Sequence, residues 1–286
     1  MSPSRPDWML IDGSSMIFRA FYGVPADVRA PDGRQVNAVR GFVDTLARML
    51  FNRRPARLAI ASDEDWRPQR RVDLIPTYKA HRVAEPVPPA LIPQMPIIEH
   101  LTECIGIDFV GAPQLEAEDV IASWVEQIPG RIEILSGDRD LFALIRDPDV
   151  TVLYPEKAGL AEVDEAEVHR RYDIPGRRYA DFALLRGDPS DGLPGLPGVG
   201  AKTAAHLITK YDGLDGLIAS GRISAVDIEY VLRAREVVTP GSPNPIPVPQ
   251  GTQPSWPVDS DRLDELVEQL GIAGNVERLL QALSAR

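Results

Sequence analysis

Two aspartates separated by one residue, Asp138 and Asp140, are the pair in this chain with the most evident chemistry. They follow the apolar run 131–135 and the dipeptide Ser136-Gly137. A buried strand here would place both carboxylates at its C-terminal end, the edge where ligands bind in open α/β sheets. Two such oxygens suit a hard divalent cation such as Mg²⁺ or Mn²⁺. Taken alone, the motif is more often a solvated Asp-Arg-Asp turn, so the other strands must decide between the two.

Two further predicted strands also end in an aspartate. The apolar run Trp8–Ile11 is followed by Asp12, and the run Leu58–Ala61 is followed, after one serine, by Asp63. Period and composition predict strands in both cases. Three strands therefore deliver carboxylates to their C-terminal ends.

A third acidic group precedes the helix predicted at 120–128. The short apolar strand Ile107–Val110 comes first, and then Glu116, Glu118 and Asp119. Acidic residues in a first helical turn are favoured by the helix macrodipole, which would explain two of them. Three within four residues, just beyond a strand, exceed what helix capping needs.

Strands that alternate with helices predict an α/β fold with a mostly parallel, twisted sheet flanked by helices. Helices are expected at 37–51, 95–105, 164–172 and 179–186, and another strand at 150–153. Because right-handed crossovers place all strand ends at one rim, the acidic groups should converge there. Seven carboxylates in one place could not all be ionised without cations. They are Asp12, Asp63, Glu116, Glu118, Asp119, Asp138 and Asp140.

Composition limits the classes of protein that fit. The chain has 286 residues, 44% of them hydrophobic, and a net charge of −11. That charge argues against nonspecific coating of nucleic acid, although it permits a nuclease with a local carboxylate cluster. The single cysteine, Cys104, excludes a disulfide framework and fits a core position in a cytoplasmic protein. No apolar run approaches the length of a membrane span, so no membrane association is expected.

The segment 64–96 differs from the rest because it is basic, rich in proline and without clear periodicity. A segment of this length is usually functional or disordered. Basic and aromatic residues together suit a channel that follows a nucleic-acid backbone and stacks on bases, and the alternative is a mobile solvated loop. The basic residues are Arg67, Arg70, Arg71, Lys79 and Arg82, and the aromatic residues of the same segment are Trp66 and Tyr78.

A glycine-rich turn precedes the helix predicted at 201–210. Gly198 and Gly200 stand directly before Lys202 and Thr203, and backbone amides at such a turn can bind an anion. The glycine spacing and the lack of a preceding strand argue against a nucleotide-phosphate loop. A hairpin between helices that binds a DNA phosphate fits better, and it would read no sequence. Beyond it we expect a linker at 239–257 and amphipathic helices at 260–270 and 276–283.

The motifs, taken in order, resemble the bacterial 5′-nuclease (flap endonuclease) family, in its stand-alone form or as the N-terminal domain of DNA polymerase I. They read MLIDGSSMIFRAFYG, YKAHR, LEAEDVIAS, SGDRDLFAL and GDPSDGLPGLPGVGAKTA. The resemblance implies a PIN-like nuclease core at 1–180, with a helical arch at about 64–96. It also implies a helix-three-turn-helix DNA-binding region at 181–286.

The resemblance also implies the site residues. Lys79 and Arg82 are expected at the scissile phosphate, and because they are three residues apart they would share one face of a helix. Two divalent ions, Mg²⁺ or Mn²⁺, are expected on nine acidic residues: Asp12, Asp63, Glu116, Glu118, Asp119, Asp138, Asp140, Asp188 and Asp191. A K⁺ ion is implied at the hairpin. The implied DNA contacts are Phe18, Arg19, Tyr22, Arg67, Arg70, Arg71, Gly198, Gly200, Lys202 and Thr203.

The function so implied is metal-dependent 5′-3′ exonuclease and flap endonuclease action in DNA replication and repair. The substrates would be DNA with 5′ ends, flaps or gaps, and RNA–DNA hybrids, and the protein would be a cytoplasmic monomer. Two alternatives remain open, a PIN-type ribonuclease and a non-catalytic protein that binds branched DNA. A phosphatase with an aspartyl nucleophile would need a second aspartate two residues after Asp12, where the chain has Ser14.

Overall fold

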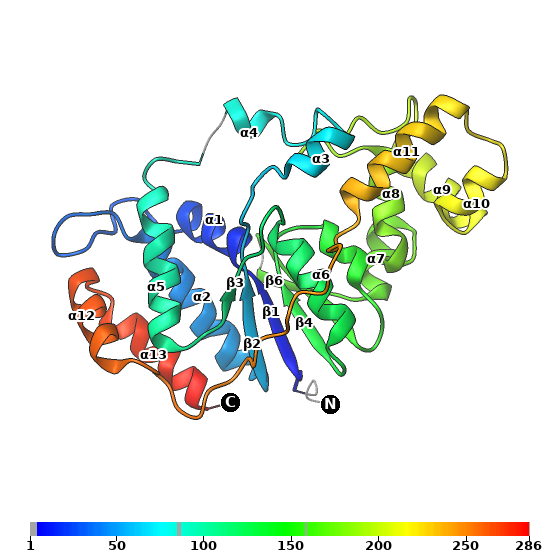
Figure 1. Ribbon diagram of the computed structural model, residues 1–286. Coiled ribbons are helices and arrows are strands. Elements are labelled where there is room, and N and C mark those ends of the chain that lie inside the picture. The colour runs from blue at the N-terminus through cyan, green and yellow to red at the C-terminus, as the bar shows by residue number, and fades with distance from the viewer. Residues whose placement is uncertain (1–4, 85–86, 158, 286) are drawn as a thin grey trace.

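The computed structural model describes residues 5–84, 87–157 and 159–285. Its centre is a six-stranded sheet with the strand order β3-β2-β1-β4-β5-β6 (Figure 1). The strands from β3 to β5 are parallel, and β6 pairs antiparallel with β5 at one edge. This confirms the predicted fold class. The strands are β1 Trp8–Asp12, β2 Arg57–Ala61, β3 Phe109–Val110, β4 Ile132–Leu135, β5 Val150–Glu156 and β6 Gly159–Val163.

Helices cover both faces of the sheet, and the alternation of side chains along β1 shows why. Met9 and Ile11 belong to one buried cluster, whereas Trp8 and Leu10 belong to the other. Both faces of the strand are apolar, as a parallel sheet enclosed in helices requires. The first face is covered by α1 Gly13–Gly23, α2 Asn37–Arg53, α5 Met95–Ile105, α12 Ser260–Leu270 and α13 Ala273–Ser284, and the second by α6 Ala117–Gln127, α7 Glu165–Tyr172 and α8 Tyr179–Arg186.

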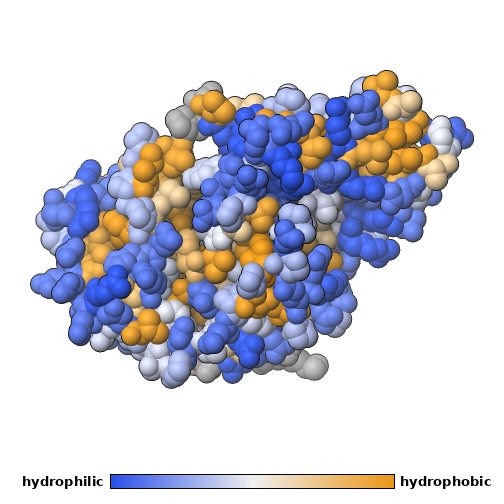
Figure 2. Space-filling view, viewed as in Figure 1, coloured by the Kyte–Doolittle hydropathy of each residue, from blue (hydrophilic) through white to orange (hydrophobic). Residues whose placement is uncertain are grey.

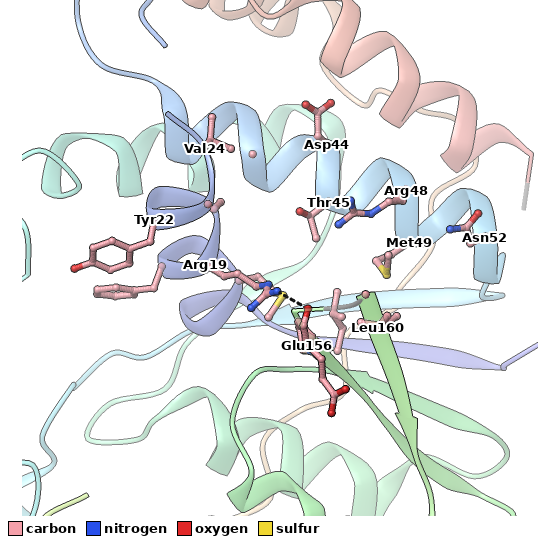
Figure 3. A pocket seen from close by; sticks show the side chains of 18 of the residues that line it. Arg19, Tyr22, Val24, Asp44, Thr45, Arg48, Met49, Asn52, Glu156 and Leu160 are labelled. Carbon is pink, nitrogen blue, oxygen red and sulfur yellow. Dashed lines mark hydrogen bonds between the residues drawn. The ribbon is translucent and has the colours of Figure 1, made fainter. Parts of the chain in front are cut away.

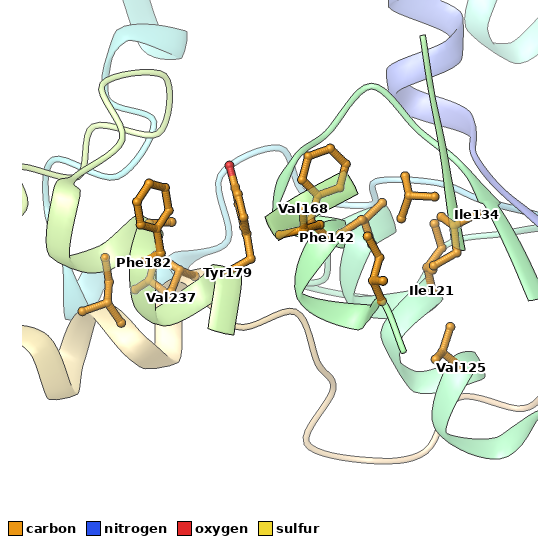
Figure 4. Close-up of a cluster of buried hydrophobic side chains, with 14 of the residues drawn as sticks. Ile121, Val125, Ile134, Phe142, Val168, Tyr179, Phe182 and Val237 are labelled. Atoms are coloured by element: carbon orange, nitrogen blue, oxygen red, sulfur yellow. The ribbon is translucent and has the colours of Figure 1, made fainter. Parts of the chain in front are cut away.

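The second cluster continues from the sheet into a helical region (Figure 4). Phe142 packs edge-to-face on Tyr179, and Phe182 and Val237 extend the same core. The region consists of α8, α9 Ala201–Tyr211, α10 Leu214–Ala219 and α11 Ala225–Val238. This continuous core fixes the hairpin before α9 relative to the end of the sheet.

The C-terminal helices return to the first face of the sheet. After an extended connection over 239–257, as predicted, α13 packs on α2 and α12 packs on α5. Asn275 and Arg278 each donate a hydrogen bond of 2.8 Å to Asp44 on α2. The predicted region 181–286 therefore consists of two parts in space, and only the part before residue 239 surrounds the hairpin.

The basic segment lies above the C-terminal end of the sheet. It contains two short helices, α3 Gln69–Leu74 and α4 His81–Ala84, followed by the 3₁₀ turn η1 Ile92–Gln94 before α5. The surface around α3 is strongly hydrophilic (Figure 2), as its sequence QRRVDL requires. Two further 3₁₀ turns are η2 Asp140–Leu144 and η3 Gly176–Arg178. No described helix is both long and apolar enough to cross a membrane.

Candidate active site

One cavity of about 740 Å³ collects eight of the nine predicted metal ligands at the C-terminal ends of β1, β2 and β4. The convergence follows from the parallel topology, which turns each of these strand ends toward the same rim. The eight residues are Asp12, Asp63, Glu116, Glu118, Asp138, Asp140, Asp188 and Asp191.

Asp12 and Asp63 lie side by side at the ends of two neighbouring strands. Asp12 caps α1 by accepting a hydrogen bond of 2.9 Å from the Ser15 amide, and the Ser136 hydroxyl donates to it at 2.5 Å. Burial and the neighbouring Asp63 charge raise the pKa of Asp12 to about 7. Burial also raises the pKa of Asp63, which accepts a hydrogen bond of 2.8 Å from the Ala117 amide. Both carboxylates are thus held in place and would ionise more readily beside a cation.

Glu118, Asp138 and Asp140 form the group best suited to bind a metal. Each offers a carboxylate oxygen, and the three oxygens lie within 4.8 Å of one another. Burial, followed by the Glu118 charge, raises the pKa of Asp138 to about 8, and burial together with Asp138 raises that of Asp140. Repulsion of this kind is relieved by a cation, and an all-oxygen donor set fits Mg²⁺ or Mn²⁺. The residues present therefore fit a divalent ion.

Asp188 and Asp191 reach the cavity from the turn after α8. The Asp188 carboxylate accepts a hydrogen bond of 2.9 Å from the Ser190 amide, and Arg186 donates to it at 3.1 Å. The Asp191 carbonyl accepts from the Lys79 amide at 2.9 Å, which joins this turn to the basic segment. Both carboxylates line the same cavity as Asp12 and Asp63.

Asp119 is the predicted ligand that does not line the cavity, and it is only 1% exposed. Its carboxylate completes a capping box with Glu116, and the Gly241 amide donates to it at 3.0 Å. The Arg71 guanidinium donates to the same Asp119 oxygen at 2.7 Å. Neighbouring donors therefore already occupy the Asp119 carboxylate in this structure, and its role as a metal ligand stays a prediction.

Arg71 also differs from expectation, since it was predicted to bind DNA. It is fully buried, and its guanidinium donates to Glu116, to Glu118 at 2.6 Å and to Asp119. A side chain in this position cannot contact a strand in the cavity. The free-energy cost of burying the Arg71 charge is offset here by the charges of three carboxylates, as a buried cation requires.

Lys79 and Arg82 were expected to share one face of a helix, and this is wrong. Lys79 has a φ of +46° and precedes α4, so the two residues do not stand on one helix. They nevertheless point to the same place. Lys79 Nζ lies 2.5 Å from Glu116 Oε1, and Arg82 Nη1 lies 3.8 Å from that oxygen. Both cations line the carboxylate cavity.

The residues predicted to contact DNA fall on different surfaces. Phe18 and Tyr22 line the carboxylate cavity, and Tyr22 is 72% exposed. Arg19 instead lines a neighbouring cavity of about 1000 Å³ between α1, α2 and the β5–β6 hairpin, where it donates to the Glu156 carbonyl at 3.4 Å (Figure 3). Arg70 is exposed on α3.

Arg67 is partly buried and spans the base of the basic segment. It donates to the backbone carbonyl of Tyr78 at 2.6 Å and to that of Pro76 at 2.8 Å. It also lines the carboxylate cavity, so a structural role and a DNA contact are compatible for this residue.

The hairpin residues lie on the surface of the helical region, away from the carboxylates (Figure 1). Lys202 and Thr203 are exposed in the first turn of α9, and Gly200 is its N-cap residue. Gly198 has a φ of +74° and open space around it, so the turn presents backbone to solvent. Glycine is needed more strictly at Gly187 and Gly195, where the two backbones approach so closely that no Cβ fits.

Trp66, Tyr154 and Arg139 are among the cavity residues that were not predicted as site residues. Trp66 packs edge-to-face on Phe18 with ring centroids 5.2 Å apart, and Tyr154 contributes to the cavity wall. Arg139, between the two aspartates, lies 3.8 Å from Asp188. For Trp66 the signal was its place directly before Arg67 at the start of the basic segment, whereas Tyr154 lies on a strand and gave none.

The fold and the acidic cavity define this protein as a nuclease of the α/β type with an attached helical domain. Residues 7–173 match the 5′-3′ exonuclease N-terminal resolvase-like domain, and residues 174–236 match the 5′-3′ exonuclease C-terminal SAM fold. The chain therefore belongs to the 5′-3′ exonuclease family.

Similar proteins support this assignment. A 5′-3′ exonuclease of Streptomyces coelicolor is 43% identical over 301 residues, covering 97% of this chain and 100% of that protein. A 5′-3′ exonuclease of Mycobacterium tuberculosis is 42% identical, covering 98% of both. A solved structure of the bacteriophage T5 flap endonuclease, in complex with DNA and metal ions, has a TM-score of 0.66 at 14% identity. The match covers 97% of this chain and 99% of that one, which is a likeness of fold.

Proposed function

We propose that this chain is a divalent-metal-dependent nuclease that hydrolyses phosphodiester bonds near the 5′ ends of DNA, including flaps and gaps. The observation that carries the proposal is the single cavity in which eight acidic residues face Lys79 and Arg82. Carboxylates alone would repel a phosphate, and cations alone would bind it without supplying a nucleophile. A cavity with both kinds of residue suits metal-assisted phosphodiester hydrolysis.

Glu118, Asp138 and Asp140 would hold Mg²⁺ or Mn²⁺, and Asp188 and Asp191, which line the same cavity, would contribute to a second site. Ions bound there would lower the pKa of a water molecule and offset the charge of the reacting phosphate. Asp12 and Asp63, fixed by hydrogen bonds to Ser15 and Ala117, are placed to act through waters.

Lys79 and Arg82 would stabilise the negative charge that develops on the phosphate oxygens. Both point at Glu116 Oε1, so a phosphate that enters the cavity can replace this carboxylate as their partner. Fixed positive groups aimed at a developing charge are an effective catalytic device in a site shielded from water. Phe18 and Trp66, packed edge-to-face on the same wall, present apolar surface on which a terminal base can stack.

The hairpin before α9 would hold the duplex through backbone amides and Lys202, and its carbonyls would accept a K⁺ ion. We further propose the division into a nuclease core at 1–180 and a helical region at 181–286, of which the part before residue 239 binds DNA and α12 and α13 support the core. RNA–DNA hybrids as additional substrates, a cytoplasmic location and a monomeric state complete the proposal. The single cysteine, which is buried, fits a reducing compartment.

A comparison of substrates tests the proposal. A 5′-labelled DNA flap and a labelled RNA hairpin are incubated with the protein in Mg²⁺, in Mn²⁺ and in EDTA. The proposal expects short 5′ products from the flap with either metal, none in EDTA, and little cleavage of the hairpin RNA. Preferential cleavage of the RNA would favour a PIN-type ribonuclease. Tight flap binding without cleavage in both metals would favour a non-catalytic binder of branched DNA.

A further inference from the structure

Arg71 lies behind the carboxylate cavity. Neither it nor Tyr78 lines that cavity, whereas its partners Glu116 and Glu118 do. Seen from the cavity, the guanidinium is therefore on the far side of the acidic turn of α6. A DNA strand or a bound cation on the cavity side would meet Glu118 first and would not reach Arg71.

The hydrogen bonds of Arg71 are divided among four partners. Nη1 donates to Glu116, to Glu118 Oε1 at 2.6 Å and to the Tyr78 hydroxyl at 2.9 Å, and Nη2 donates to Asp119 Oδ1 at 2.7 Å. The Tyr78 hydroxyl in turn donates to Glu116 at 2.5 Å. A planar guanidinium can bridge several carboxylates in one fixed geometry, which an ammonium group cannot do.

Glu118 connects this network to the candidate metal site. One of its oxygens accepts from Arg71, and the residue also contributes to the group of three carboxylates with Asp138 and Asp140. Arg71 therefore holds the Glu118 side chain in one orientation before a cation arrives.

We infer that Arg71 is a positioning residue, which fixes Glu118 as a ligand for the divalent cation from behind the site. The inference rests on the proposed metal-dependent function. It also assigns a task to the base of the basic segment, because Arg71 belongs to α3, and α3 packs on α11. Partners that orient a metal ligand in this way commonly contribute about 10-fold to 100-fold to metal affinity.

The test measures Mn²⁺ binding to the DNA-free protein by titration calorimetry in wild type and Arg71→Lys. The lysine keeps the positive charge but lacks the planar guanidinium that bridges the carboxylates. The Mn²⁺ dissociation constant should therefore rise by about 10-fold or more. Arg70→Lys, the neighbouring exposed arginine on the same helix, is the matched control and should leave Mn²⁺ affinity unchanged. The flap dissociation constant of Arg71→Lys in EDTA should stay within about twofold of wild type.

Cleavage gives a second readout. The Mg²⁺ concentration that gives half the maximal cleavage rate should rise by the same factor in Arg71→Lys. The cleavage rate should recover in excess Mg²⁺, which a merely structural defect would not permit. Tighter Mn²⁺ binding by the variant would mean that Arg71 competes with the cation, and unchanged binding would mean that it only supports the fold. Either result overturns the inference. Wild-type protein that binds Mn²⁺ but cleaves no DNA would instead overturn the proposed function.

A milder variant keeps the inference testable if Arg71→Lys does not fold. Tyr78→Phe removes one acceptor of Arg71 and one donor to Glu116 without changing any charge. Loss of these hydrogen bonds should weaken Mn²⁺ binding by about twofold to fivefold. Unchanged or tighter binding in this variant overturns the inference as well.

Discussion

The first turn of α6 and the end of β4 both present carboxylates to one cavity, but their surroundings differ. Glu116 and Glu118 accept hydrogen bonds from Arg71, and Glu116 also accepts from Lys79. Asp138 and Asp140 form no ion pair with any arginine or lysine within the ranges 5–84, 87–157 and 159–285. The Arg71 and Lys79 charges hold the pKa of Glu118 below its ordinary value against burial, whereas burial raises the pKa of Glu116 to about 7 and that of Asp138 to about 8.

The difference teaches how a site for a cation can be built at a crowded rim. On the α6 side, the positively charged side chains of Arg71 and Lys79 hold the acidic turn in place before any ligand binds. On the β4 side the repulsion is left in place, and a divalent ion is the partner that relieves it. The cost of this repulsion is tolerated because the surrounding core is large and continuous.

Removing a carboxylate from the β4 side should have the largest effect on activity. Asp140→Asn deletes a charge that no residue of the protein replaces, so the single-turnover cleavage rate should fall by about a thousandfold or more, ~4 kcal/mol. Flap affinity in EDTA should change little, because the cavity keeps Lys79 and Arg82. Quenched-flow cleavage and a parallel binding titration measure both quantities. A near wild-type rate in Mg²⁺ would show that the β4 pair does not bind the reactive ion.

Removing a positively charged side chain from the α6 side should have the next largest effect on activity. Lys79→Ala should slow single-turnover cleavage by about two decades, ~3 kcal/mol, as loss of a transition-state contact would. It should also lower the melting temperature, since it leaves the buried Glu116 with fewer partners.

Arg82→Ala is the matched control for that loss of stability. Arg82 is 36% exposed along its side chain and lies farther from Glu116, so its removal should slow cleavage with little change in melting temperature. If Lys79→Ala loses only DNA affinity and keeps its rate at saturation, the lysine steers the strand and takes no part in the chemistry.

The two sides should also differ in their dependence on pH. Asp138 binds its proton more tightly in the folded state, with a pKa of about 8 against an ordinary value of 3.8, and Asp12 shifts in the same direction. Between these values the folded protein binds more protons than the unfolded chain, so its free energy of unfolding falls as pH rises.

The melting temperature in EDTA should therefore fall from about pH 5 to pH 8, and Mg²⁺ should stabilise more at pH 8 than at pH 5. Differential scanning calorimetry measures both trends. Asp138→Asn removes one of the titrating groups and should flatten the slope in EDTA. A melting temperature that rises over this range in EDTA would contradict the assignment of the β4 side as the uncompensated one.

The smallest expected effect lies outside the cavity, at the hairpin. Lys202→Ala should weaken duplex binding and lower the salt slope of the binding constant by about one, as loss of one phosphate contact implies. Lys210→Ala, at the other end of α9, is the control and should leave the slope unchanged. Turnover at saturating DNA should hardly change. An unchanged salt slope for Lys202→Ala would exclude this lysine from the duplex contact.

Much of this arrangement could be predicted from the sequence, for physical reasons. Parallel strands share one rim, so apolar runs that end in Asp12, Asp63 and Asp138 predicted the acidic cavity. The contact between Glu118 and the buried Arg71 could not be predicted, because the sequence does not show which oxygen of a carboxylate faces solvent and which faces the interior. For the same reason, the sequence did not indicate that Asp119 and Arg71 are buried.

Other features depend on tertiary contacts that leave no local pattern. The positive φ of Lys79 breaks the helical spacing that placed it with Arg82, yet both side chains still meet at Glu116. Strand β6 was not predicted because it is short and mostly exposed at the edge of the sheet. Helix α11 has apolar residues on more than one side, so the helical spacing of its apolar residues is weak in the sequence.

The position of the bound cation tests this comparison most directly. Crystals of the protein soaked in Mn²⁺ would be measured at a wavelength where manganese scatters anomalously, with Asp140→Asn crystals treated in the same way. We expect a peak at about 2.0–2.6 Å from carboxylate oxygens of Glu118, Asp138 and Asp140, and its loss or marked weakening in the variant. A peak bound only by Asp12 and Asp63, or no peak at the end of β4 at saturating Mn²⁺, would contradict it.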